Sequence, residues 1–133
     1  MTVLSTDTTA SVSTHVLDTS TGRPAEAVTV SLAARSGGDA QYAALGGSAT
    51  DADGRCKDLP ALPEGTTHVR LVFDTESYFT AKKQAEAQQD APRVRDSGAF
   101  FPEVAIAFAV TPGEHYHVPL LLNPFGYSVY RGS

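Results

Sequence analysis

The sequence has little of three features, and each absence excludes a class of protein. Cys56 is the single cysteine, so an internal disulfide cannot form and a secreted disulfide scaffold is excluded. The 10 basic residues are outnumbered by 15 acidic residues and form no cluster, which argues against nucleic acid or an anionic membrane surface as a partner. No apolar run approaches the roughly 20 residues that span a bilayer.

The N-terminal stretch also lacks the basic start and the apolar core of a signal peptide. We therefore expect a cytoplasmic protein. The chain has 133 residues, of which 41% are apolar and 19% charged, enough for one domain with its own hydrophobic core. Residues 1–10 are small and polar and are predicted to form a flexible arm, so the domain is expected to cover residues 11–133.

Short runs in which apolar and polar residues alternate make up most of the chain. Alternation with a period of two is typical of strands that bury one face. Turn residues separate the runs at the spacing typical of a sandwich, for example at Asp51–Gly54. The predicted fold is therefore all-β, an antiparallel sandwich of two sheets with seven or eight strands.

One stretch, residues 74–98, breaks the alternation and is rich in Ala, Gln, Lys and Glu. Asp74 or Thr75 is suited to cap a short helix. The composition predicts that this helix runs to somewhere between residues 84 and 88, that Pro92 stops it, and that a surface loop follows.

Strand parity places histidines on an outer surface. In the run 11–18, His15 lies opposite the apolar residues, and His117 does so in the run 115–122. The same parity collects four polar side chains on one face: His15, His117, Ser128 and Tyr130. His115 is expected to precede its strand and to face solvent. A face that combines imidazoles with apolar groups indicates a subunit interface or a pocket.

Two other interpretations of the histidines stay open at this point. A histidine on a strand is most often an ordinary surface residue, and we assign His68 to that group because it has no companions. The spacing His115-x-His117 also occurs in zinc sites on strands, with His15 as a third ligand. That pattern is weak, since no carboxylate or cysteine is close in sequence, and we expect no bound metal.

Four segments give the chain a resemblance to a known family: THVLDTSTGRPA (14–25), TDADGR (50–55), FFPEVAIAF (100–108) and HYHVPLLLNPFGYSVYRGS (115–133). They resemble the 5-hydroxyisourate hydrolases, the transthyretin-like enzymes of urate breakdown. The resemblance extends from about residue 11 to the end. The terminal YRGS is its most specific part, because it looks like the enzyme signature that transthyretin carriers lack.

The resemblance implies hydrolysis of 5-hydroxyisourate to 2-oxo-4-hydroxy-4-carboxy-5-ureidoimidazoline without a cofactor. It also implies a homotetramer, a dimer of dimers with pockets at the dimer–dimer interface. Carried over by position, the catalytic residues would be His15, Arg55, His117 and Ser133. Three further residues would bind substrate: Tyr130, Arg131 and Gly132. One histidine would then act as general base, and Arg55 would stabilise the oxyanion.

The chain departs from the family pattern at three places. The stretch 80–97 looks longer than usual, Asn123 stands where serine is expected, and Val129 stands where threonine is expected. Because Val129 should point into the core, this exchange need not touch the site.

Two non-catalytic alternatives were weighed against the hydrolase. A transthyretin-type binding protein would share the fold and hold a small aromatic ligand between dimers, but it would not need His15, Arg55, His117 and the YRGS tail. A structural adhesion module would have no cluster of polar residues and would be one domain of a longer chain.

Overall fold

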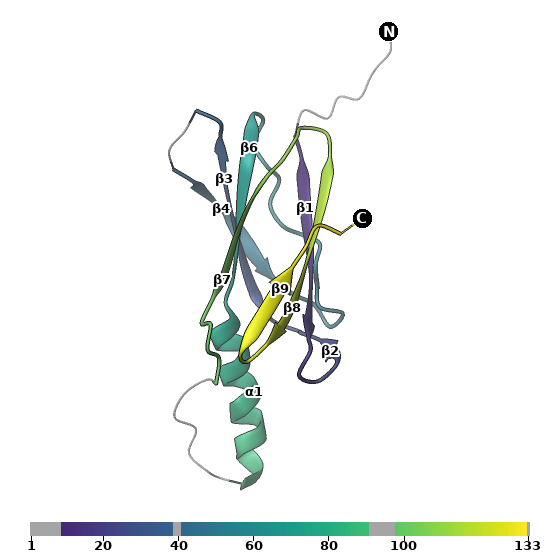
Figure 1. Cartoon of the computed structure of the whole chain (residues 1–133), viewed down its shortest axis with the longest axis vertical. Coiled ribbons are helices and arrows are strands. Elements are labelled where there is room, and N and C mark those ends of the chain that lie inside the picture. The colour runs from purple at the N-terminus through teal and green to yellow at the C-terminus, as the bar shows by residue number, and fades with distance from the viewer. Residues whose placement is uncertain (1–8, 39–40, 91–97, 133) are drawn as a thin grey trace.

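The computed structural model describes residues 9–38, 41–90 and 98–132. Two β-sheets face each other and one helix projects from an end of the sandwich (Figure 1). This arrangement confirms the predicted all-β sandwich with one helix. Most of the predicted arm, residues 1–8, lies outside the described residues, so the division between arm and domain stays a prediction.

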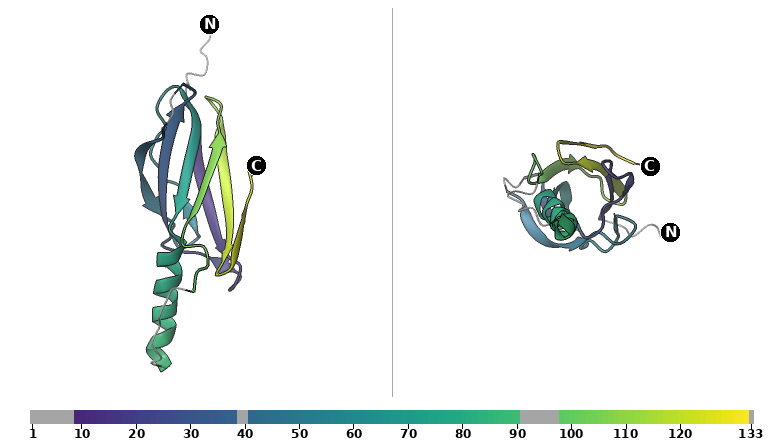
Figure 2. Two further views of the ribbon diagram at one scale, coloured as in Figure 1. Left: turned by 60° about the vertical axis from the view of Figure 1, so that its left-hand side comes forward. Right: turned by 90° about the horizontal axis from the view of Figure 1, so that it is seen from below.

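The first sheet has the strand order β2-β1-β8-β9, with β5 also paired to β1. Its strands are β1 (Ser11–Asp18), β2 (Arg23–Pro24), β5 (Arg55–Cys56), β8 (His115–Asn123) and β9 (Gly126–Val129). The second sheet has the order β4-β3-β6-β7. Its strands are β3 (Thr29–Ser36), β4 (Ala43–Ala49), β6 (Thr66–Phe73) and β7 (Val104–Ala109). Figure 2 shows the two layers from the side and from below.

One pairing departs from the antiparallel prediction. Strands β1 and β8 run parallel, from Ser11 opposite His115 to Asp18 opposite Leu122. The other strand pairings in the described part of the chain are antiparallel. Alternation could not reveal this exception, because parallel and antiparallel strands share the same period of two.

The core lies between the sheets and is built from the inward faces that alternation predicted. On β1 and β8 the buried side chains are Val12, Thr14, Val16, Tyr116, Val118, Leu120 and Leu122. The opposite layer contributes Val30, Leu32, Val69, Leu71 and Phe73. Thr14 is a polar member of this set, and its hydroxyl donates a hydrogen bond of 2.6 Å to the carbonyl oxygen of Val118. Its polar group is therefore satisfied without water.

Helix α1 (Thr75–Asp90) leaves the sandwich directly after β6. Asp74 is its N-cap, because one carboxylate oxygen accepts the backbone N–H of Ser77 at 3.0 Å and the other accepts the hydroxyl of Ser77 at 2.7 Å. The helix ends slightly past its predicted end, and Pro92 lies outside the described residues. No helix in the described part of the chain combines the length and the apolarity needed to cross a membrane.

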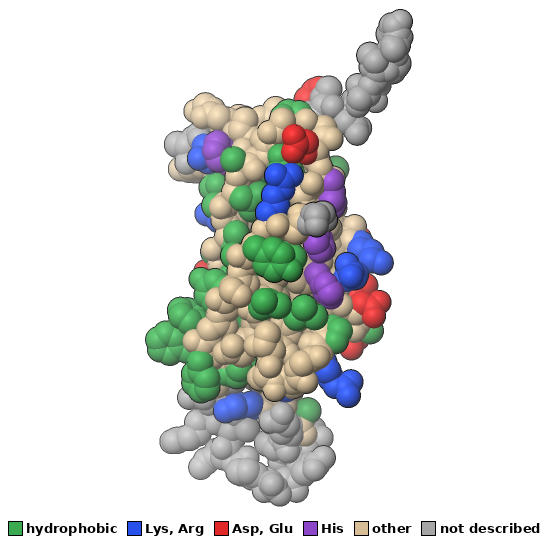
Figure 3. Space-filling view, turned by 45° about the vertical axis from the view of Figure 1, so that its right-hand side comes forward, with side chains coloured by type: hydrophobic (Ala, Val, Ile, Leu, Met, Phe, Trp, Pro, Cys, Tyr) green, Lys and Arg blue, Asp and Glu red, His purple; other side chains and the backbone are tan. Residues whose placement is uncertain are grey.

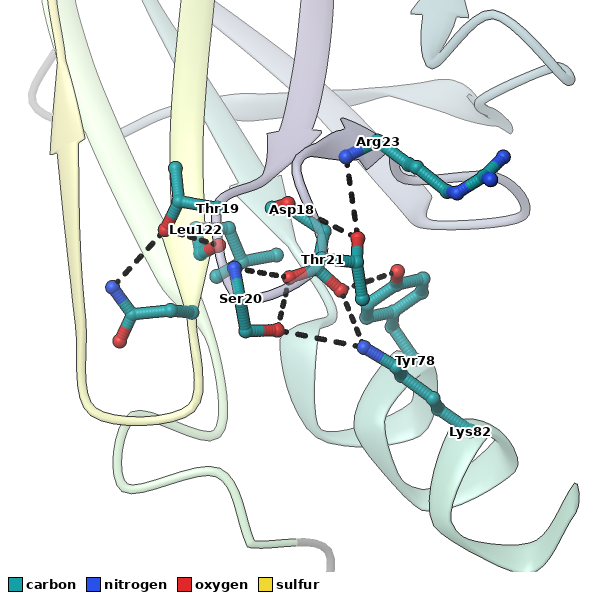
Figure 4. Close-up of polar contacts among 9 residues, drawn as sticks. Asp18, Thr19, Ser20, Thr21, Arg23, Tyr78, Lys82 and Leu122 are labelled. Carbon is teal, nitrogen blue, oxygen red and sulfur yellow. Dashed lines mark hydrogen bonds and ion pairs between the residues drawn. The ribbon is translucent and has the colours of Figure 1, made fainter. Parts of the chain in front are cut away.

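Asp18, the last residue of β1, ties the helix to the first sheet (Figure 4). Its buried carboxylate accepts hydrogen bonds from the backbone N–H of Ser20 at 2.9 Å, from the Tyr78 hydroxyl at 2.7 Å and from Lys82 Nζ at 3.0 Å. The hydroxyl of Ser20 donates a further bond. Burial alone would raise the pKa of Asp18, but the donors from Ser20, Tyr78 and Lys82 outweigh it and hold the pKa below its ordinary value.

Replacing this carboxylate should destabilise the fold in a pH-dependent way. Asp18→Asn should lower the free energy of unfolding at neutral pH by about 2–3 kcal/mol, because the amide loses the charge that Lys82 pairs with. The lowered pKa means that this stabilisation is complete above the ordinary value of 3.8 and is lost as the pH falls through the folded-state pKa.

Urea unfolding of both proteins at neutral and at strongly acidic pH measures the effect. The difference between them should shrink at acidic pH. Glu26→Gln removes an exposed carboxylate and should change stability little. A deficit of Asp18→Asn that is equal at both pH values would contradict this account of the anchor.

Candidate active site

The outward residues of β1 and β8 form a polar surface centred on histidines. The parallel register sets Ser11 opposite His115 and Ser13 opposite His117, so these four side chains lie on one face. His15 follows on β1 and points to the same side. Figure 3 shows histidine side chains in a row on this face, with basic and acidic side chains beside them. The outward direction predicted for His15 and His117 agrees with their partial burial beside fully buried neighbours.

A tight turn places Arg55 beside His15. The carboxylate of Asp51 accepts the backbone N–H groups of Asp53 at 2.9 Å and Arg55 at 3.0 Å, which closes the turn predicted from TDADGR. Gly54 has a φ of 77°, and a Cβ there would lie 2.4 Å from a backbone oxygen of β1. Glycine is therefore required for the turn to pack against the strand. Strand β5 then pairs with β1 so that Arg55 lies opposite His15.

The same turn determines the tautomer of His15. Its Nε2 lies 2.9 Å from the backbone oxygen of Asp53. A carbonyl oxygen only accepts hydrogen bonds, so Nε2 carries the proton, and in the neutral ring Nδ1 keeps the lone pair. The local sequence of the turn thus places Arg55 beside His15 and also fixes the tautomer of His15.

His117 lies on the central strand β8 and is held on two sides. Ser13 Oγ lies 2.8 Å from its Nδ1, and the backbone N–H of Gly132 donates to its carbonyl oxygen at 2.7 Å. Burial lowers the pKa of His117, and the positive charge of Arg55, followed by His15 and His115, lowers it further. His117 is therefore neutral at physiological pH and available as a base.

A cleft of about 420 Å³ opens beside this cluster. Arg55 and His117 line it together with Lys57, and the segment 59–61 supplies a wall of leucine, proline and alanine. Such a cleft suits a small, planar and oxygen-rich molecule, because a guanidinium presents a flat fork of donors.

The C-terminal tail reaches the cluster through its backbone. Gly132 forms an isolated antiparallel bridge with His117. A Cβ on Gly132 would lie 3.0 Å from the His117 ring carbon Cδ2 and 3.4 Å from the Pro119 ring. A larger residue at this position would require the His117 ring or the tail to shift. The predicted catalytic residue Ser133 lies outside the described residues.

Two predicted substrate-binding residues, Tyr130 and Arg131, are placed elsewhere. They line a separate groove of about 250 Å³ with Ile106 and Phe108 of β7. The Arg131 guanidinium lies 4.3 Å from the centre of the Tyr116 ring, and it also pairs with Glu114 at 3.3 Å. The structure thus brings together His15, Arg55, His117 and Gly132, whereas Arg131 fastens the tail to the end of the sandwich.

Three residues of the cluster were missed or misplaced by sequence reasoning. The expectation that His115 precedes its strand is wrong, since it is the first residue of β8, although its side chain is exposed as expected. The sequence patterns assigned no role to Ser11 or Ser13. The signal was the shared period of S-x-S-x-H and H-x-H, but only the register of β1 and β8 shows that the two patterns meet.

In the described part of the chain, no group of three or more histidine, cysteine, aspartate or glutamate side chains is arranged to hold a metal ion. The expectation of a site without metal stays a prediction for experiment.

The electrostatic account of His117 can be tested by an NMR pH titration. The pKa of His117 should lie below the ordinary value of 6.5. Arg55→Gln should raise it, because a positive charge is removed, while burial keeps it below the ordinary value. Arg70→Gln removes a guanidinium from β6 in the other sheet and is the matched control. A His117 pKa at or above the ordinary value in the unmodified protein would refute the account.

The family model HIUase/Transthyretin matches residues 12–132 of this chain. Among curated proteins, the 5-hydroxyisourate hydrolase of Salmonella dublin is 40% identical over 124 residues, which cover 92% of this chain and 80% of the relative. Residues 12–132 include the turn that carries Arg55, the whole of β8 and β1 from Val12 onward.

Solved structures share the fold over nearly the whole chain. The 5-hydroxyisourate hydrolase of Klebsiella pneumoniae has a TM-score of 0.63 and 35% identity, covering 93% of this chain and 94% of its own. Sea bream transthyretin, solved in complex with thyroxine, has a TM-score of 0.73 and 25% identity, covering 91% and 93%. Fold alone does not separate an enzyme from a thyroxine-binding protein. The family model and these identities show that the chain belongs to the HIUase/Transthyretin family.

Proposed function

We propose that this protein hydrolyses 5-hydroxyisourate to 2-oxo-4-hydroxy-4-carboxy-5-ureidoimidazoline in urate degradation. One observation carries the proposal: His15, Arg55 and His117 come from three strands and meet on one face beside a cleft. These are the positions at which the sequence resembles the catalytic residues of the hydrolases. The names of the Salmonella and Klebsiella relatives support the same reaction.

We assign the general base to His117. Water attacks a carbonyl carbon of the substrate ring while the imidazole takes its proton, and the adjacent C–N bond opens as the leaving nitrogen takes a proton from His117. A positioned base of this kind contributes about 10²- to 10⁴-fold in rate. The lowered pKa of His117 keeps the ring in the form that accepts a proton.

Arg55 supplies positive charge where the carbonyl oxygen becomes negative. Its guanidinium is always protonated and presents donors in a plane. Removing one such donor typically costs about 10²- to 10³-fold in kcat. His15 lies opposite Arg55 in the strand register and offers Nδ1 as an acceptor, because Nε2 is engaged by Asp53.

The tail and the oligomer belong to the same proposal. Gly132 seats the tail against His117, which supports a role for Ser133 in orienting water or substrate. Tyr130 and Arg131 would contribute by holding the tail from the separate groove that they line. A homotetramer of the family type would cover the polar and apolar outer face of the first sheet. We place the protein in the cytoplasm and expect it to act without a cofactor.

The alternative is a non-catalytic protein that binds a small ligand, and the fold shared with thyroxine-bound sea bream transthyretin favours it. The two functions differ at the site. A binding channel for an apolar aromatic ligand has no need for two imidazoles and a guanidinium on one face, whereas hydrolysis needs a base and an oxyanion donor.

A spectroscopic assay tests the function directly. 5-Hydroxyisourate is generated in a cuvette from urate and urate oxidase, and its absorbance is followed after this protein is added, with and without a chelator. Decay should be much faster than the spontaneous reaction and unchanged by the chelator. Decay at the spontaneous rate would favour the binding protein instead, and loss of activity with chelator would reveal a metal requirement.

Variants in the same assay assign the roles. His117→Ala should lower kcat by about 10²-fold or more with a much smaller change in KM. His68→Ala removes a histidine from the other sheet and is the matched control. Near-normal turnover of His117→Ala would remove this residue from the mechanism.

The glycine of the tail gives a separate prediction. Gly132→Ala should lower kcat by about tenfold or more, because the added methyl group displaces either the tail or the His117 ring, and small misplacements at a site are costly. Gly126→Ala is the control on β9, since its Cβ would meet only the Asn123 side chain at 4.0 Å. Equal activity of the two variants would show that the tight approach of Gly132 has no catalytic value.

A further inference from the structure

We propose that Ser13 is a positioning residue that couples His117 to His115 in a proton relay across β1 and β8. The inference rests on the proposed function, because it assumes that His117 is the base. It assigns roles to two residues, Ser13 and His115, that the resemblance to the hydrolases leaves without one.

The geometry is an unbroken chain of hydrogen bonds. Ser11 Oγ lies 2.6 Å from His115 Nδ1. Ser13 Oγ lies 2.9 Å from His115 Nε2 and 2.8 Å from His117 Nδ1. The two separations at Ser13 are ordinary hydrogen-bond lengths, and the one at Ser11 is short. Ser13 therefore stands between two imidazoles and bonds to both.

The single proton of the Ser13 hydroxyl couples the tautomers of His115 and His117. A serine hydroxyl has one proton and two lone pairs, so Ser13 can donate to only one imidazole. A relay between the rings requires that it donate to one imidazole and accept from the other. If Ser13 donates to His117, the neutral His117 carries its proton on Nε2 and has no lone pair left for water. If Ser13 donates to His115, the Nδ1–H of His117 points at Ser13 and Nε2 keeps the lone pair. Only the second arrangement makes His117 a base.

The second arrangement also provides a path for the proton. Once His117 Nε2 has taken a proton from water, the ring is an imidazolium. Its Nδ1 proton passes to Ser13 Oγ while the hydroxyl proton of Ser13 passes to His115 Nε2. Ser13 keeps one proton throughout, and the positive charge moves from His117 to His115. Because His115 is exposed and His117 is half-buried, solvent stabilises the charge on the outer ring. When the C–N bond opens, the leaving nitrogen takes the Nε2 proton of His117, and the proton held by His115 returns through Ser13 to His117 Nδ1. All three groups then regain their starting forms.

Nearby charges favour this direction. Burial and the positive charge of Arg55 on β5 both disfavour a charged His117, and His15 on β1 adds to the effect. Lys57 lines the same cleft. The carboxylate of Glu114, the residue before β8, is engaged by Arg131 and by the Tyr116 hydroxyl. Passing the charge outward therefore moves it out of the more buried position.

The register of the strands does not depend on the Ser13 hydroxyl. The main chains of β1 and β8 pair along the whole of β1, and the side chain of Ser13 is on the outer face. Ser13→Ala should therefore fold normally. This separates loss of the relay from loss of structure.

The tautomers of the resting protein provide the first test. In long-range ¹H–¹⁵N correlation spectra of histidine-labelled protein above the histidine pKa values, His117 should carry its proton on Nδ1. In Ser13→Ala this preference should be lost. An Nε2–H tautomer of His117 in the unmodified protein would overturn the proposal. This measurement needs no turnover, so it remains decisive even if the protein proves not to hydrolyse 5-hydroxyisourate.

Kinetics provide the second test. Ser13→Ala should lower kcat by about tenfold or more, a part of what a positioned base contributes, with KM changed less than about twofold. Ser13→Thr keeps the hydroxyl and should retain activity within about threefold, since threonine suits a strand. Ser31→Ala, which removes an exposed hydroxyl from β3 of the other sheet, is the matched control. A wild-type kcat for Ser13→Ala, or a failure of Ser13→Thr to restore it, would count against the relay.

The outer end of the relay is tested with His115→Phe. This variant should lower kcat, and added imidazole, which can collect the proton at Ser13, should restore part of the loss. Unchanged turnover of His115→Phe would mean that the proton stays on His117, and it would refute the relay.

Discussion

The parallel ladder between β1 and β8 is the constraint on which the rest of the structure depends. Its register pairs apolar residues with apolar residues on the inner side, such as Val16 with Leu120, and polar residues with histidines on the outer side, such as Ser13 with His117. The inner pairs supply the burial that stabilises the sandwich. The buried inner pairs hold the outer pairs in position, so the polar side chains of the candidate site do not need to stabilise the fold.

Much of this arrangement could be read from the sequence. Alternation identified the buried face of each long strand because a strand side chain has only two directions to choose from. The turn at TDADGR was visible because few residues besides glycine tolerate the positive φ of Gly54. The outward direction of His15 and His117 followed from the same parity, and the resemblance to the hydrolases implied that Arg55 and the tail act with them.

The sequence pattern does not show which strands are neighbours, so contacts between strands could not be predicted from it. Period-two patterns do not encode strand direction, so the parallel pairing and the meeting of Ser13 with His117 were invisible. The position of the Arg131 side chain could not be predicted for a similar reason. Its guanidinium packs on Tyr116 and pairs with Glu114, a contact set by how the tail leaves β9 and not by the motif YRGS itself.

The two strands of the ladder are also far apart in the chain, since the Ser13–His117 hydrogen bond spans 104 residues. Closing so long a loop is entropically costly and makes folding slow compared with local pairing. A nascent chain emerging from the ribosome can form the second sheet, but it cannot assemble the histidine face until its last strands are synthesised. Assembly of the catalytic face is thus one of the late events of folding.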